Sequence, residues 1–85
     1  MKIDVSALEP VFKKLKKRDF ALFNALQKKI NQIAELDRDS INHFKNLRKP
    51  LNDYKRVHVG SFVLMFKVEG EVIIFDRFEH HDNAY

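Results

Sequence analysis

The chain of 85 residues has no cysteine, no tryptophan, and only two glycines and two prolines. Without cysteine, neither a disulfide framework nor a thiolate zinc site can hold the protein together, and we expect a reducing, cytoplasmic location. Little glycine and proline argues against a disordered or low-complexity chain. Long hydrophobic runs are also absent, because the longest, Phe62–Phe66 and Val72–Phe75, are far too short to cross a bilayer. The N-terminus does not read as a signal peptide, so we predict a soluble protein that does not interact with membranes.

What the chain does contain is apolar surface and charge. Hydrophobic residues make up 45% of the sequence, eight of them phenylalanines, and 33% of the residues are charged. A chain of this length has room for a single hydrophobic core, so we predict one domain over residues 1–85. Residues 1–58 hold fourteen Lys/Arg against seven Asp/Glu, whereas residues 59–85 hold two against five. The basic first part favours a polyanionic partner such as a nucleic acid, although a solvated lysine-rich helix face would give the same pattern.

The first half of the chain has the periodicity of two helices. Leu8, Phe12 and Leu15 recur at helical spacing, and Ser6 or Pro10 marks a start near Ser6–Glu9. Asp19 is a good N-cap for a second helix, whose apolar stripe consists of Phe23, Leu26, Ile30 and Ile33. Residues 1–5 fit a short first strand. We expect the two helices to be antiparallel and to bury these stripes.

After an irregular connector over residues 37–53, the period changes to two. Residues 54–59, 62–68 and 72–78 read as three antiparallel strands joined by turns at Gly60-Ser61 and Glu69-Gly70. Two-residue turns would align Val57 with Leu64 and Leu64 with Phe75, giving an apolar face that packs on the helices. The fold class predicted is therefore α+β, with two N-terminal helices packed on a small, strongly twisted antiparallel sheet.

The opposite face of this sheet combines polar and apolar side chains. It holds Tyr54, Arg56, His58, Val63, Met65, Lys67, Val72, Ile74 and Asp76. Met65, Val72 and Ile74 suggest an exposed apolar patch that another polypeptide covers. Arg77 falls on the helix-facing side in this register, which favours a structural role, whereas a bulge in the last strand would free it to bind phosphate.

The order of these elements, together with short motifs in the second half, resembles the RelE/ParE superfamily of toxins. Members commonly show a Leu-x-x-x-Leu connector, an Arg-x-Arg-Val-Gly strand, a Tyr-Arg-x-x-Tyr strand, a glycine hairpin and a His-Arg-x-x-x-Tyr tail. The matching positions here are Leu47, Leu51, Arg56, Val59, Gly60, Phe66, Gly70, Arg77, His80 and Tyr85. The resemblance implies a toxin that cleaves mRNA in the ribosomal A site and is neutralised by a RelB-like antitoxin, with operator DNA bound only through the antitoxin.

The resemblance also implies a catalytic surface built from cations rather than from a metal or another cofactor. Arg56, His58, His81 and Tyr85 are the candidate catalytic residues, and Arg48, Lys49, Lys55, Arg77 and His80 are candidates for binding RNA phosphates. His58 is the favoured base, His81 a donor to the scissile phosphate, and Tyr85 a residue that orients or stacks on a base. Met65, Val72 and Ile74 are the candidates for antitoxin binding, through an amphipathic, acidic segment of the partner.

Two departures from the family pattern affect this chemistry. Val63 and His81 stand where the family usually has arginines, so two phosphate-binding charges are missing. Histidine can transfer a proton near neutral pH but is charged only part of the time, so we expect a slow nuclease or one with altered roles. A gyrase inhibitor of the ParE type and a catalytically weak homologue that acts only in antitoxin binding and co-repression are the alternatives.

Simpler interpretations remain for several of these residues. His43 reads as a solvated surface residue, Tyr85 is the final residue of the sequence, and His80-His81 could form a plain polar tail. We do not expect a metal site at this tail, because adjacent histidines rarely point at one ion.

Overall fold

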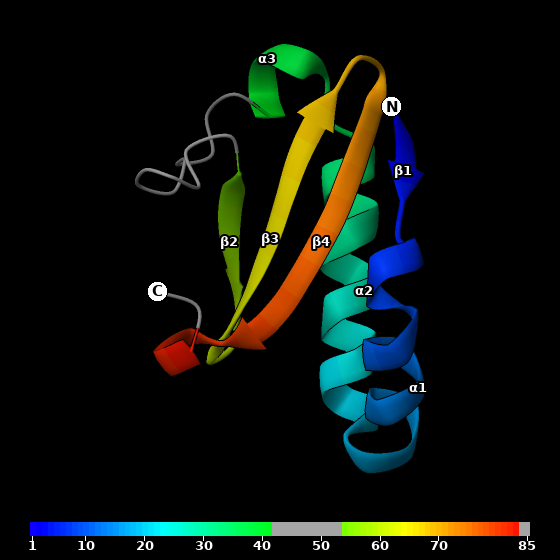
Figure 1. Ribbon diagram of the computed structural model, residues 1–85, viewed down its shortest axis with the longest axis vertical. Coiled ribbons are helices and arrows are strands. Elements are labelled where there is room, and N and C mark those ends of the chain that lie inside the picture. Colours follow the sequence, from blue (N-terminus) through cyan, green and yellow to red (C-terminus); the bar gives the residue numbers. More distant parts are fainter. Residues whose placement is uncertain (42–53, 84–85) are drawn as a thin grey trace.

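A computed structural model describes residues 1–41 and 54–83 of the protein (Figure 1). The elements run in the order β1 (Lys2–Asp4), η1 (Ser6–Leu8), α1 (Glu9–Arg18), α2 (Phe20–Ala34), α3 (Arg38–Ile41), β2 (Lys55–Val59), β3 (Phe62–Glu69), β4 (Val72–His80) and η2 (His81–Asn83). The helical hairpin of α1 and α2 lies against one side of the sheet, and the predicted α+β fold is confirmed.

The two long helices begin and end where local chemistry favours it. Helix α1 starts at Glu9 with Pro10 in its first turn, and Ser6 belongs to the preceding 3-10 turn rather than capping the helix. The Asp19 side chain accepts a hydrogen bond from the Leu22 backbone N–H at 3.1 Å, as predicted for the N-cap of α2. The Asp19 backbone N–H also donates to the Leu15 carbonyl at 2.9 Å, so one residue ends α1 and starts α2.

The sheet has the strand order β1-β4-β3-β2. Strands β2, β3 and β4 form the predicted antiparallel meander, but β1 pairs parallel with β4, through Lys2 opposite Val72 and Asp4 opposite Ile74. The sheet is thus mixed rather than wholly antiparallel. Gly60 and Gly70 open the two hairpin turns with φ of 61° and 60°, values that other residues avoid and that type II′ turns require at this position.

The register between β3 and β4 differs from the prediction in two ways. The turn falls at Gly70-Glu71 rather than Glu69-Gly70, which moves the pairing by two positions and leaves every side chain on its predicted face. A bulge between Met65 and Phe66 then adds one residue to β4, so Leu64 lies opposite Phe78 instead of Phe75. The extra residue reverses the alternation of side chains between the two faces of the sheet. The faces predicted for the residues of β4 after Asp76 were therefore wrong.

The core lies between the helices and the near face of the sheet. Leu26, Ile30 and Ile33 of α2 are buried, as predicted, against Phe66 and Phe75 and their neighbours from the sheet. Each such side chain contributes about 1.5–3 kcal/mol of burial free energy. The core therefore holds one face of the sheet against the helices, and the other face of the sheet lies outside this core. Among the described residues, no helix is long and apolar enough to cross a membrane.

Candidate nucleic-acid interface

The candidate interface is the open face of the sheet, the side turned away from α1 and α2. Strand pairing places side chains there in two adjacent rows. Arg56 lies opposite Met65, which lies opposite Arg77, and His58 lies opposite Val63, which lies opposite Glu79. Because neighbouring strands are about 4.8 Å apart, the backbones at Arg56 and Arg77 are separated by about 10 Å with Met65 between them.

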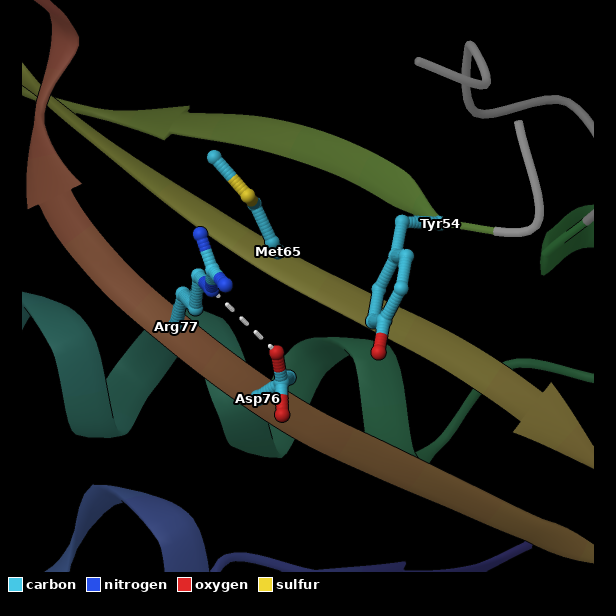
Figure 2. A pocket seen from close by; sticks show the side chains of 4 residues that line it. All are labelled: Tyr54, Met65, Asp76 and Arg77. Carbon is cyan, nitrogen blue, oxygen red and sulfur yellow. Dashed lines mark ion pairs between the residues drawn. The ribbon is translucent and has the colours of Figure 1, made fainter. Parts of the chain in front are cut away.

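Arg77 lies where the alternative with a bulge in the last strand placed it, and not on the helix-facing side that strict alternation favoured. The bulge puts Asp76 and Arg77 on the open face together, rather than Arg77 beneath the sheet. Figure 2 shows both side chains with Met65 and Tyr54, the four residues that line a pocket on this face. The Arg77 Nε lies 3.5 Å from the Asp76 carboxylate, and 54% of the arginine side chain is exposed. At this distance and exposure the ion pair is weak, so a phosphate could replace Asp76 as the partner of Arg77.

The apolar part of the open face is less exposed than the sequence suggested. Met65 is only 2% exposed and Val63 is fully buried, and the two form a cluster against which Tyr54 packs. Met65 therefore does not belong to an exposed patch, whereas Val72 and Ile74 are half-buried at the other end of the face. Val63 belongs to a small apolar cluster with Met65 and Tyr54.

Lys67 lies beside this cluster. Its ammonium is 3.1 Å from the Glu69 carboxylate and 5.3 Å from the centre of the Tyr54 ring. The hydrogen bond and charge of Glu69, with a smaller contribution from Tyr54, hold the pKa of Lys67 above its usual value. Lys67 remains a cation at neutral pH and adds to the positive charge of Arg56 and Arg77.

The predicted histidines gather at one end of the sheet. His58 is exposed near the end of β2, and the His81 backbone N–H donates to the Ser61 carbonyl at 3.0 Å, which ties the tail to the turn that follows β2. The predicted return of His81 to this end is confirmed. His80 lies opposite Phe62, and its ring meets the Phe62 ring edge-to-face at 5.4 Å. Because the bulge reverses the alternation of side chains, His80 lies on the same side of the sheet as Phe62 and not in the row of His58.

The remaining predicted residues divide into two groups. Lys55 lies opposite Phe66, so alternation turns it to the side away from Arg56, as expected. Arg48, Lys49, His43 and Tyr85 lie outside the described residues. Tyr54 and Asp76 line the pocket but were missed as site residues, although period-two alternation had already placed both on this face.

Comparison with known proteins identifies the family. No family model matches the chain. A protein of Methanocaldococcus jannaschii named "Putative toxin RelE4" is 45% identical over 82 residues, which cover 93% of this chain and 83% of the relative. The chain belongs to the RelE family of toxins. An uncharacterized protein of Methanosarcina mazei is 32% identical over 83 residues, covering 94% of this chain and 92% of that protein.

A solved structure has the same fold as this RelE-family chain. The solution structure of the conserved hypothetical protein HP0894 from Helicobacter pylori superposes with a TM-score of 0.63, covering 99% of this chain and 96% of that one. The identity is 16%, so this similarity concerns the fold alone. In this fold, the open face carries Arg56 and His58 on β2 and Arg77 on β4, with β3 between the two strands.

Proposed function

We propose that this chain is the toxin of a type II toxin-antitoxin pair and an endoribonuclease that cleaves mRNA in the ribosomal A site. The observation that carries the proposal is membership of the RelE family combined with Arg56, Arg77 and His58 on the open face. The M. jannaschii relative is named as a RelE toxin, which favours mRNA cleavage over inhibition of gyrase. No cofactor takes part in the proposed reaction.

The proposed chemistry assigns separate tasks to the residues of the open face. Cleavage requires activation of the ribose 2′-oxygen, stabilisation of the extra charge on phosphorus, and protonation of the leaving 5′-oxygen. His58 is the candidate base, while Arg56 and Arg77, on either side of Met65, bind the phosphate oxygens. His81, at the same end of the sheet as His58, takes the place of the family's arginine as a protonated donor to the scissile phosphate, and its proton passes to the leaving 5′-oxygen. Arg48 and Lys49 contact neighbouring phosphates, and Tyr85 stacks on a base. His80, which lies on the side of Phe62, has no task in this scheme.

The experiment that tests this proposal uses purified protein and defined substrates. We expect it to cut mRNA on programmed ribosomes, within the codon in the A site, and to leave the same mRNA intact when ribosomes are omitted. DNA gyrase should turn over normally in its presence. Intact mRNA together with trapped, cleaved DNA would assign the chain to gyrase inhibition, and inactivity in both assays would identify a non-catalytic homologue.

The proposed partner is a RelB-like antitoxin with an amphipathic, acidic segment. Val72 and Ile74 are half-buried on the open face and offer apolar area, and residues 1–58 carry the excess of Lys and Arg that attracts an acidic chain. Met65 contributes beneath the surface, through its packing with Val63 and Tyr54.

Binding to the co-encoded neighbouring protein tests this partner. Ile74→Asp puts a charge into the proposed contact and should weaken binding by at least about tenfold, a loss of about 1.4 kcal/mol. Asn31→Asp, on the exposed side of α2, adds the same charge elsewhere and should leave the affinity unchanged. Equal affinities for the two variants, measured by calorimetry, would remove Ile74 from the interface.

A further inference from the structure

The end of β4 brings three potential metal ligands together. Within the described residues, His80, His81 and Asp82 each offer one ligand atom, and these atoms all lie within 4.8 Å of one another. The His80 Nδ1 is 3.5 Å from one Asp82 oxygen, and the His81 Nε2 is 3.0 Å from the other. Adjacent histidines rarely converge in this way. Here they do because the chain passes from strand β4 into the 3-10 turn η2 between them.

The spacing of these atoms suits a transition metal ion. Zn²⁺ binds imidazole nitrogen and carboxylate oxygen at about 2.0–2.2 Å, so tetrahedral ligand atoms lie roughly 3.3 Å apart. The N···O distances of 3.5 and 3.0 Å are close to this value and end on the two different oxygens of Asp82, and one ligand atom from each residue lies within 4.8 Å of the other two. Two imidazoles and a carboxylate are also a ligand set that Zn²⁺ and its neighbours in the periodic table prefer over Mg²⁺ or Ca²⁺.

The surrounding structure holds two of the three ligands in position. The Phe62 ring meets the His80 ring edge-to-face, and the Asp82 backbone N–H donates to the His80 Nδ1 at 3.3 Å. The lone pair of that nitrogen therefore already points toward Asp82. The hydrogen bond from the His81 N–H to the Ser61 carbonyl fixes the turn on the neighbouring hairpin. A bound ion would replace the long hydrogen bond with a coordinate bond and keep the turn as it is.

We infer that His80, His81 and Asp82 form a binding site for one Zn²⁺ ion or a similar divalent transition-metal ion, with water completing the coordination. His81 and Asp82 are half or more exposed, so the ion can enter from solvent without any rearrangement of the core. Such an ion is not part of the proposed cleavage reaction.

Calorimetric titration of the untagged protein with ZnCl₂ tests the site directly. We expect one ion per chain at micromolar concentration, and Asp82→Asn or His81→Ala should weaken binding by at least about tenfold. His58→Ala removes an exposed imidazole from a different strand and should bind as tightly as the parent. Equal affinity in all four proteins, or binding that begins only at millimolar Zn²⁺, would overturn the inference.

A second readout on the parent protein avoids any question of variant folding. On addition of Zn²⁺, the imidazole NMR signals of His80 and His81 should shift together and saturate at one equivalent, while those of His58 stay in place. A bound ion also stabilises the folded state by mass action, so the midpoint of thermal unfolding should rise. Shifts at His58 alone, or at no histidine, would contradict the site.

One consequence rests on the proposed function. An ion held by His81 occupies the nitrogen assigned to the scissile phosphate, so Zn²⁺ should slow mRNA cleavage over the concentration range in which it binds. Because calorimetry measures Zn²⁺ binding without any need for cleavage activity, the metal site and the proposed function are tested separately. A protein that binds Zn²⁺ and cleaves no mRNA contradicts the proposed function alone, and one that cleaves mRNA but binds no Zn²⁺ contradicts the inference alone.

Discussion

Arg77 shows how a single extra residue changes the chemistry of a sheet face. Phe75 and Phe78 are both buried, although strict alternation would turn them to opposite sides. The bulge between them places Asp76 and Arg77 next to each other on the open face. The pattern Phe-Asp-Arg-Phe, with apolar residues three apart in a strand, is a signal from which the bulge could have been predicted.

Replacement of Arg77 tests whether its new position matters for activity. A charge-assisted contact to phosphate contributes about 1.5–3 kcal/mol, so Arg77→Ala should slow single-turnover cleavage by roughly ten- to a hundredfold. Its exposed ion pair with Asp76 contributes little, so the free energy of unfolding should change by less than about 0.5 kcal/mol. Lys28→Ala removes one exposed positive charge from α2 and should leave the rate unchanged. Equal rates for the two variants would contradict a phosphate contact at Arg77.

Asp4 offers a prediction about pH. The Ser6 hydroxyl donates to the Asp4 carboxylate at 2.7 Å and the Ser6 backbone N–H donates at 3.0 Å, and these bonds lower the pKa of Asp4 below its usual value of 3.8. A lowered pKa means that the stabilisation is present above pH 3.8 and is lost as the pH falls through the folded value. Ser6→Ala should move the pKa of Asp4 back toward 3.8, as measured by an NMR titration of the carboxyl. An unchanged pKa in Ser6→Ala would show that the hydroxyl is not the main cause.

At the scale of elements, the junction between α1 and α2 depends on one side chain. Asp19 caps α2, so Asp19→Ala should lower the free energy of unfolding by about 1 kcal/mol. Asp19→Asn keeps an oxygen acceptor and should cost only a few tenths of a kcal/mol. Urea denaturation of the three proteins measures both changes. Equal loss in the alanine and asparagine variants would mean that charge, rather than the capping bond, stabilises the junction.

The elements differ in how far the sequence predicts them. Helical spacing of Leu26, Ile30 and Ile33 identifies α2 and its buried side, and alternation with glycine turns identifies β2, β3 and β4. The parallel pairing of β1 with β4 could not be predicted, because three residues carry no pattern that specifies a partner or a direction. The sequence also could not decide between a turn at Gly70-Glu71 and one at Glu69-Gly70, since either places the glycine in a two-residue loop.

At the scale of the whole molecule, the helices α1 and α2 cover one face of the sheet (Figure 1), and the proposed site lies on the other. The alternation of side chains along a strand predicted that Arg56 and His58 lie together on the open face, and the structure agrees. The burial of Met65 could not be predicted, because its cluster with Val63, two residues away on the same strand, and with Tyr54, just before β2, is a matter of tertiary packing. The grouping of His80, His81 and Asp82 was likewise hidden, because it arises from the turn after β4.

The central claim is that the open face, rather than positive charge in general, carries the cleavage chemistry. Lys55 and Arg56 test it most directly, because these adjacent cations lie on opposite faces of β2. We would measure single-turnover cleavage of mRNA on programmed ribosomes for the parent, Arg56→Ala and Lys55→Ala. Arg56→Ala should be slower than the parent by roughly ten- to a hundredfold, and Lys55→Ala should stay within about threefold of it. A Lys55→Ala variant that loses activity while Arg56→Ala cleaves at the parent's rate would contradict the account.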